Sequence, residues 1–266
     1  MRTLPELWVV RPGPVGYRPA REAQDALEAA RHAGELPDVM LLLEHPPVYT
    51  KGRRAQPSEL PMGEEWYRMQ GIEVADTDRG GRVTYHGPGQ LVAYPIVSLK
   101  PYGDDVHAYV RRMEETMIAA LGDWGVGAQT IDGLTGVWTA GGPPPGGEAR
   151  KIGSIGIHVN RGITTHGLAI NVNNDLQPFE WIVPCGIEAV RMTSLARELG
   201  AEQDLAAFAA TLARRFAEIY GRDLVEVSLA GLLERVPAAS GLAAVDAFGG
   251  PRTTESSNRG DVASVP

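Results

Sequence analysis

Two neighbouring segments in the middle of the chain predict an antiparallel pair of strands with unusually little side-chain volume. The segments cover residues 151–159 and 163–172, and Asn160 and Arg161 lie at the turn between them. Small residues recur in both segments, namely Gly153, Gly156, Gly167 and Ala169. Because alternate residues of a strand point to one face of a sheet, small side chains on facing strands leave a groove there. We expect this groove to suit an apolar chain, with four apolar residues along it: Ile152, Ile155, Leu168 and Ile170.

A third glycine-rich segment, Arg79 to Gln90, has the sequence RGGRVTYHGPGQ. Its four glycines flank a short predicted strand over residues 82–85, where they allow close approach of the backbone and positive φ angles. A ligand could lie along such a strand, with backbone N–H groups as donors and Arg79 or His86 near its polar end. A tight hairpin with a glycine-lined turn would explain the same pattern, and the histidines of these segments could each serve packing alone.

The rest of the chain predicts a layered fold of helices and strands. Helices are predicted where apolar residues recur every three to four positions, over residues 17–33, 104–121, 193–199 and 204–220. Further strands are predicted from short apolar runs, over residues 7–10, 39–43, 72–75, 91–97, 126–131 and 136–139. This alternation predicts an α+β fold with one mixed or antiparallel sheet layered with helices.

We expect one catalytic domain over residues 1–237. A surface loop rich in glycine and proline is predicted over residues 141–147. The composition then shifts to Gly, Ser, Thr, Pro and Asn, which predicts a flexible C-terminal tail over residues 238–266.

The bulk composition argues against several classes of protein. A formal net charge of −8 argues against general nucleic-acid binding, which uses basic surfaces. No apolar run approaches the roughly 18 residues of a membrane span, and the N-terminal segment MRTLPELWVV is too short and too charged for a signal peptide. A single cysteine favours the reducing cytoplasm. Without a C-x-x-C or H-E-x-x-H motif, we expect no metal site.

Cys185 is the only cysteine of the chain, so it either fills space in a core or its chemistry is used. Free cysteines are often buried and inert. Lys151 favours the second interpretation, because only three of the 25 Lys and Arg residues are lysines and one of them stands in a glycine-rich segment. Arginine keeps its proton in proteins, whereas lysine can release one. Cys185 and Lys151 are therefore the candidate catalytic pair.

Four motifs closely resemble, in the same order, those of the lipoyl(octanoyl) transferase family, also called lipoate-protein ligase B. They are Arg79–Gln90, Arg150–His158, Thr165–Asn171 and Pro184–Ile187. The similarity runs from about Leu7 to Tyr220 and leaves out the 141–147 loop and the tail. The resemblance implies a fold shared with biotin and lipoate protein ligases, of the class II aminoacyl-tRNA synthetase and biotin synthetase type.

The resemblance also implies an activity, its partners and a set of site residues. The family transfers octanoate from octanoyl-acyl carrier protein to a lysine of a lipoyl domain, through an acyl-cysteine. The acceptors would be lipoyl domains of 2-oxoacid dehydrogenases and the glycine cleavage H protein. Cys185 stands at the position of the nucleophile and Lys151 at that of its partner lysine. The substrate-binding residues would be Arg79, Gly80, Gly81, Arg82, Val83, Thr84, Tyr85, His86, Ser154, Ile155, Gly156, Gly167, Leu168 and Ala169.

The chemistry of the two catalytic residues agrees with this reaction. A neighbouring ammonium favours a thiolate, and a thiolate exchanges one thioester for another at little cost in free energy. Attack of an amine on acyl-Cys185 then gives an amide, which is downhill, so no ATP and no other cofactor is expected. Two alternatives stay open. One is an ATP-dependent lipoate or biotin ligase of the same fold, and the other is a non-catalytic module that holds carrier proteins or acyl chains.

Overall fold

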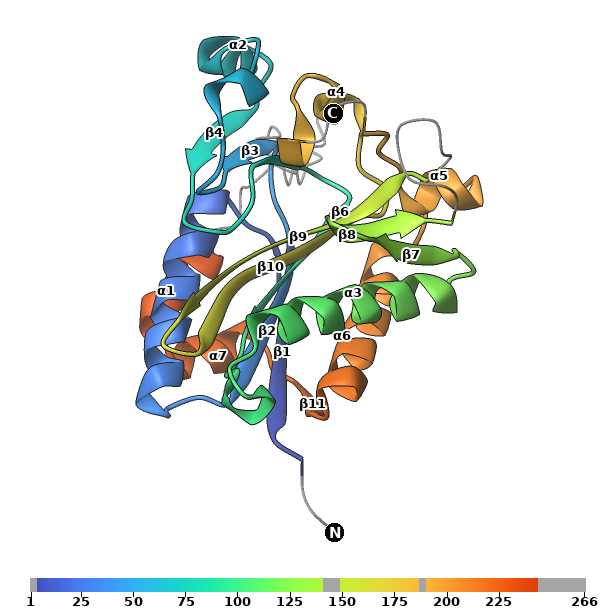
Figure 1. The fold of residues 1–266 in the computed structure, drawn as a ribbon. Coiled ribbons are helices and arrows are strands. Elements are labelled where there is room, and N and C mark those ends of the chain that lie inside the picture. Colours follow the sequence, from blue (N-terminus) through green and yellow to red (C-terminus); the bar gives the residue numbers. More distant parts are fainter. Residues whose placement is uncertain (1–3, 141–148, 187–189, 244–266) are drawn as a thin grey trace, which may run out of the picture.

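A mixed sheet of eight strands runs through the centre of the computed structural model, which describes residues 4–140, 149–186 and 190–243 (Figure 1). Its strands are β1 (Glu6–Pro14), β2 (Asp38–Glu44), β6 (Gln90–Ile96), β7 (Ala128–Ile131), β8 (Leu134–Thr139), β9 (Lys151–Asn160), β10 (Ile163–Asn171) and β11 (Asp223–Glu226). Their order is β11-β1-β2-β6-β10-β9-β8-β7. β1 runs parallel to β2 and to β11, and the other neighbours are antiparallel. The predicted α+β fold with a mixed sheet is confirmed.

A second sheet has three strands in the order β4-β3-β5. They are β3 (Val48–Lys51), β4 (Glu73–Asp76) and β5 (Val83–His86). The expectation of a single sheet is therefore wrong. The central strand β3 escapes prediction because it has four residues and directly follows Pro46 and Pro47, too short a run to show alternation.

Helices cover both faces of the large sheet (Figure 1). α3 (Val106–Asp123) and α6 (Leu205–Tyr220) pack on one face, and α1 (Tyr17–Ala33) and α7 (Leu229–Arg235) on the other. The shorter helices are α2 (Glu64–Met69), α4 (Gln177–Glu180), α5 (Leu195–Leu199) and the 3-10 turns η1 (Pro57–Glu59), η2 (Lys100–Tyr102), η3 (Pro184–Gly186) and η4 (Pro237–Ala243). α1 has the predicted bounds, because its buried alanines recur on one face and Gly34 ends it with a φ of 76°.

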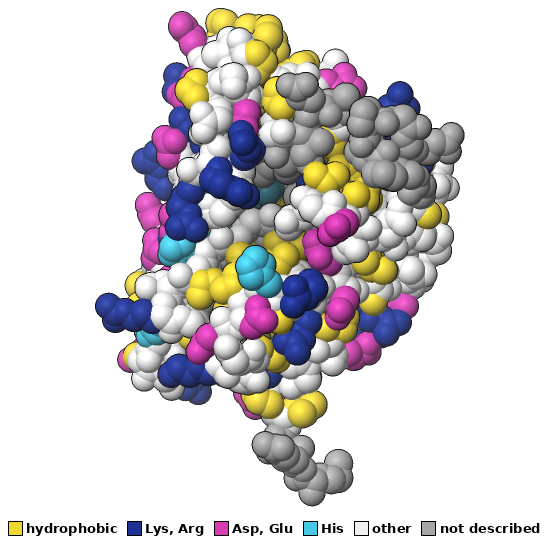
Figure 2. Space-filling model, in the orientation of Figure 1, with side chains coloured by type: hydrophobic (Ala, Val, Ile, Leu, Met, Phe, Trp, Pro, Cys, Tyr) yellow, Lys and Arg dark blue, Asp and Glu magenta, His cyan; other side chains and the backbone are white. Residues whose placement is uncertain are grey.

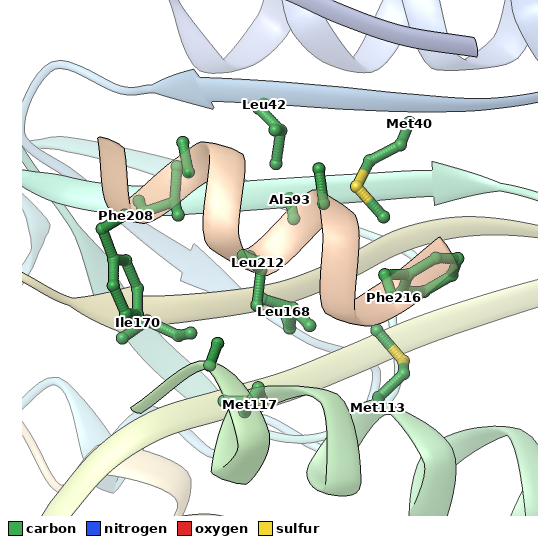
Figure 3. Packing of buried hydrophobic residues seen from close by; sticks show 14 of the residues in the cluster. Met40, Leu42, Ala93, Met113, Met117, Leu168, Ile170, Phe208, Leu212 and Phe216 are labelled. Carbon is green, nitrogen blue, oxygen red and sulfur yellow. The ribbon is translucent and has the colours of Figure 1, made fainter. Parts of the chain in front are cut away.

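Alternation along the strands divides the apolar side chains between two cores. On β6, Ala93 belongs to the core with α3 and α6, whereas the next residue toward the N-terminus, Val92, belongs to the core with α1. Figure 3 shows the first core, where Phe216 of α6 and Met113 and Met117 of α3 pack near the strands. Removal of these apolar side chains from water is the main stabilising contribution to the fold.

The last described residues pack against α1. Ala239 and Leu242 of η4 are buried in the core on that face of the sheet. Residues 238–243, which are part of the predicted tail, thus contribute to the core. The predicted 141–147 loop and residues 244–266 lie outside the described residues. No helix in the described part of the chain has the length and apolar character needed to cross a membrane.

Candidate active site

A cleft of about 1010 Å³ opens beside α3 and is visible as a hollow in Figure 2. Residues of β9 and β10 line it on one side. The loop 79–82 with β5, the part of α3 from Val106 to Ile118 and the turn over residues 130–135 supply its other walls. Basic side chains gather along one rim of the hollow in Figure 2. The cleft therefore collects residues from segments that are far apart in the sequence.

Most of the predicted substrate-binding residues line this cleft. They are Arg79, Gly80, Gly81, Arg82, Thr84, His86, Ser154, Ile155, Gly156, Gly167, Leu168 and Ala169. Val83 and Tyr85 do not, because they alternate with Thr84 and His86 along β5 and pack in the core of the small sheet.

The apolar groove predicted along the paired strands is only partly present. Ile155 and Leu168 line the cleft, but Ile152 and Ile170 are fully buried in the core with α3 and α6. Ile152 precedes Gly153, whose position on β9 is already packed against Met117 of α3, so no groove can open there.

The cleft borders both faces of the β9–β10 pair. Gly156 stands opposite Gly167, and Ile155 opposite Leu168, so that small and large side chains point to different faces. β8 pairs with β9 only near Lys151 and Gly153, which leaves the later part of β9 without β8 as a neighbour. The 79–82 loop reaches this part, where the N–H of Gly80 donates to the carbonyl of Ile157 at 2.8 Å.

Arg79 holds the glycine-rich loop in place. Its Nη2 donates to both the carbonyl and the hydroxyl oxygen of Thr50, each at 2.7 Å, and to the carbonyl of Arg82 at 2.9 Å. Gly156 lets this loop approach, because a Cβ at that position would stand 3.0 Å from the Arg79 Cδ and from the Gly80 oxygen. Arg79 is 7% exposed, so its buried guanidinium supports the wall of the cleft and presents little surface to the solvent.

Asp78 anchors the same loop to α1 and β10. Its Oδ1 lies 2.7 Å from Nε2 of His166, and Arg21 donates to both carboxylate oxygens at 3.2 and 3.0 Å. The hydrogen bond from His166 and those from Arg21 hold the pKa of the Asp78 carboxyl well below its usual value. His166 itself adopts a positive φ of 56°, which interrupts the regular strand beside Gly167.

His86 presents a neutral imidazole to the cleft. Burial, and secondarily repulsion from the nearby His45 ring when that ring is protonated, lower the pKa of His86 to about 3. Its Nδ1 lies 2.7 Å from Oε1 of Gln90, whose amide nitrogen donates to Tyr85 and Asn171. The Gln90 oxygen must therefore accept, so Nδ1 of His86 carries the proton and Nε2 is left as an acceptor.

Lys151 is buried at the start of β9, with 2% of its surface exposed. Its Nζ donates to the carbonyl oxygen of Thr135 at 2.9 Å and lies 5.2 Å from the ring centre of Trp138. Its backbone N–H donates to the carbonyl of Arg191 at 2.8 Å, and its carbonyl accepts from Thr193 at 3.0 Å. Lys151 also lines the cleft, and its backbone lies beside residues 191 and 193, which follow Cys185 in the sequence.

Cys185 belongs to η3, and its side chain lies outside the described part of the structure. The next residue, Gly186, lines the cleft and packs so closely on Arg82 that a side chain there would collide with it. Upstream, the N–H of Val183 donates to the carbonyl of Glu59 at 3.0 Å. The backbone is therefore held before Cys185 by Glu59 and after it at the cleft, and the pairing of the Cys185 thiol with Lys151 stays a prediction.

Sequence reasoning missed two buried acidic residues of this region. Glu59 accepts from Arg82 Nη1 at 2.6 Å, and Glu114 of α3 accepts from the N–H of Gly136 at 2.9 Å. Neither belongs to a motif. Glu114 lies among the apolar residues of an amphipathic helix, but this position alone does not distinguish it from other acidic residues of helices.

The chain shares its fold with lipoate protein ligases and matches the model of one protein family. The structure superposes on a bipartite lipoate protein ligase from Thermoplasma acidophilum with a TM-score of 0.65, at 18% identity over 91% of each chain. A lipoate-protein ligase A bound with ATP gives a TM-score of 0.66, at 18% identity over 91% of this chain and 93% of that one. Residues 17–217 match the family model of the lipoyl protein ligase A/B catalytic domain.

Sequence comparison identifies the branch of this family. An octanoyltransferase of Acidobacterium capsulatum is 42% identical over 80% of this chain and 89% of its own length. Those of Thermobifida fusca and Chloroflexus aggregans are 49% and 45% identical, over 70% and 83% of this chain and 76% and 96% of their own lengths. The chain therefore belongs to the octanoyltransferases of the lipoyl protein ligase A/B catalytic-domain family, and the resemblance seen in its motifs is confirmed.

Proposed function

We propose that the protein transfers octanoate from octanoyl-acyl carrier protein to a lysine of lipoyl domains, by way of a thioester on Cys185. Lys151 acts as the general acid and base of both half-reactions. The acceptors are the lipoyl domains of 2-oxoacid dehydrogenases and the glycine cleavage H protein, in the cytoplasm. The site includes the substrate-binding residues of the three glycine-rich segments that line the cleft.

One observation carries the proposed roles of the two catalytic residues. A buried lysine lines the same cleft as Gly186, the residue after the only cysteine. The backbone of Lys151 is also hydrogen-bonded to residues 191 and 193, so it lies next to the segment that leaves Cys185. A proton-transfer group and a nucleophile from distant parts of the sequence would meet in one place.

The reaction then balances in two steps. The Cys185 thiolate attacks the thioester carbonyl of the donor, a new C–S bond forms, and the carrier thiol leaves with a proton from Lys151. In the second step Lys151 takes a proton from the acceptor amine, the C–N bond forms and the Cys185 thiolate leaves. The apolar side chains of Ile155 and Leu168 offer the acyl chain a surface away from water.

An ATP-dependent ligase of the same fold is not favoured. The relatives at 42–49% identity are octanoyltransferases, whereas the ligase structures share only 18% identity and show the fold alone. A thioester donor is already activated, so the transfer needs no adenylate.

The test is to incubate the protein with octanoyl-acyl carrier protein without ATP and to measure the mass of the peptide that contains Cys185. We expect an octanoyl adduct that disappears when a lipoyl domain is added, and no adduct in Cys185→Ser. Normal transfer by Cys185→Ser would contradict the covalent mechanism. Formation of AMP from ATP and octanoate would instead indicate a ligase, and the absence of both products a non-catalytic module.

A further inference from the structure

A single peptide unit joins Lys151 to a buried carboxylate on α3. The Nζ of Lys151 donates to the carbonyl oxygen of Thr135 at 2.9 Å. The N–H of the next residue, Gly136, donates to Oε1 of Glu114 at 2.9 Å. This carbonyl and this N–H belong to the same planar peptide bond, so the orientation of one end sets that of the other.

The peptide unit is packed directly against the lysine side chain. Gly136 has a φ of 116°, which few residues other than glycine adopt. A Cβ on Gly136 would stand 2.6 Å from the Gly153 oxygen and 2.9 Å from Cε of Lys151. The glycine therefore allows a contact that fixes the end of a long and otherwise flexible side chain.

Glu114 occupies an unusual place for a carboxylate. It is 8% exposed and lies between Val110 and Ile118 on the face of α3 that lines the cleft. Burial of a carboxylate costs free energy unless hydrogen bonds compensate for the lost water. Its bond to Gly136 reaches across to β8, outside its own helix, so it acts on the geometry of that strand.

We infer that Glu114 is a positioning residue for Lys151, acting through the peptide unit between Thr135 and Gly136. The carboxylate of Glu114 holds the peptide unit so that the carbonyl oxygen of Thr135 faces Nζ of Lys151. The negative carboxylate lies at the positive N–H end of the peptide dipole, and the ammonium lies at its negative carbonyl end. The inference rests on the proposed proton transfer by Lys151. Misplacement of a reacting group by about 1 Å can reduce a rate by about 10²-fold.

Two substitutions separate the hydrogen bond from the size of the side chain. Glu114→Gln keeps an oxygen that accepts from Gly136, and its kcat for octanoyl transfer should stay within about 5-fold of wild type. Glu114→Met keeps the volume but removes the acceptor, and its kcat should fall about 10²-fold with an unchanged KM for octanoyl-acyl carrier protein. A wild-type kcat in folded Glu114→Met would overturn the inference.

Glu28→Met is the matched control for loss of a buried carboxylate. Glu28 is 7% exposed on α1, accepts from Nδ2 of Asn160 at 2.6 Å and does not line the cleft. This variant should lose thermal stability and keep its kcat. A kcat loss equal to that of Glu114→Met would reduce Glu114 to a structural role. If Glu114→Met does not fold, Glu114→Asp replaces it in the test. The aspartate side chain is too short to reach Gly136, so this variant should show the same loss of kcat.

A double-mutant cycle links the effect to Lys151 and keeps the two proposals apart. Lys151→Arg should lower kcat by about 10²-fold or more, since arginine does not release its proton. In that background Glu114→Met should cause no further loss, because it acts through the lysine. Additive losses would overturn the positioning role alone. A wild-type kcat in Lys151→Arg would overturn the proposed role of Lys151, and the inference about Glu114 would fall with it.

Discussion

His45 and His86 place two neutral imidazoles next to each other beside the cleft, with ring centres 5.7 Å apart. Burial lowers the pKa of His45 to about 4 and that of His86 to about 3. His45 accepts from the hydroxyl of Tyr94 and donates to the carbonyl of Val15. Both rings therefore act as hydrogen-bonding groups at neutral pH, and a charge on either one is unfavourable.

These shifted pKa values predict a loss of stability in mild acid. The unfolded chain binds a proton on each histidine near pH 6.5, and the folded chain does so only near pH 3 to 4. Above about pH 6.5 these histidines do not reduce the free energy of unfolding. Below this pH the free energy of unfolding decreases, by up to about 1.4 kcal/mol per pH unit for each histidine. In His86→Gln, the decrease in unfolding free energy from pH 7 to pH 5 should be about 2 kcal/mol smaller than in wild type. Urea denaturation at both pH values measures it, and an equal decrease would contradict a neutral His86.

Residues that depart from the composition of the chain could be predicted from the sequence. Lys151 stands out among arginines and Cys185 as the only thiol. Glu59 and Glu114 could not be predicted, because acidic residues are common on helices and their burial depends on strands more than twenty positions away. Tyr85 is predicted to lie in the site because it belongs to a continuous motif. Strand alternation instead points its side chain away from the cleft and into the core of the small sheet.

Among the secondary-structure elements, η1 links the small sheet to the segment before Cys185. The carboxylate of Glu59 accepts from Arg82 Nη1 at 2.6 Å and from the N–H of Val83 at 3.3 Å. Its carbonyl accepts from Val183 at 3.0 Å. Arg82 in turn packs on Gly186, so η1 contacts the chain before the proposed nucleophile directly and the chain after it through Arg82.

Loss of the charge on Glu59 should therefore loosen that segment. In Glu59→Gln we expect faster amide hydrogen exchange at residues 183 and 186 and a kcat about 10-fold below wild type, since small displacements of a nucleophile are costly. Glu64→Gln is the control, because it removes ion pairs of similar length, with Lys51 at 2.7 Å and Arg68 at 2.9 Å, away from the cleft. The same exchange and kcat in both variants would show that Glu59 does not position the segment.

The sequence predicts the long periodic helices, and it predicts β4 and β5 to within a residue, but it does not predict the short strands β3 and β11. α1 and α6 have strong apolar stripes and glycine at their C-terminal ends, so their bounds were found to within a residue. β11 has four residues and pairs in parallel with β1, from the other end of the chain. A pairing of this kind depends on the packing of the whole sheet and leaves no local pattern.

Considered as a whole, the molecule carries a charge that opposes its proposed donor. The net charge is −8, and acyl carrier proteins are generally acidic, so docking needs a local basic surface. Arg150 is a weak candidate for this basic surface, because its charge is compensated by an ion pair with Glu198 at 2.7 Å. Arg53 and Arg54 are exposed, and their backbone N–H groups bond to the glycine-rich loop at Arg79 and Gly81. Arg54 also lines the cleft.

Charge reversal at the rim should therefore slow the reaction only with a protein donor. Arg54→Glu should reduce the rate of Cys185 acylation by octanoyl-acyl carrier protein about 10-fold at low salt and leave acylation by octanoyl-pantetheine unchanged. The wild-type rate with the carrier protein should fall as salt rises, because screening weakens attraction between exposed charges. Arg235→Glu makes the same charge change at an exposed position on α7 that does not line the cleft, and should preserve both rates. If Arg54→Glu slows both donors equally, Arg54 acts on the chemistry of the cleft, and the basic rim does not recruit the carrier protein.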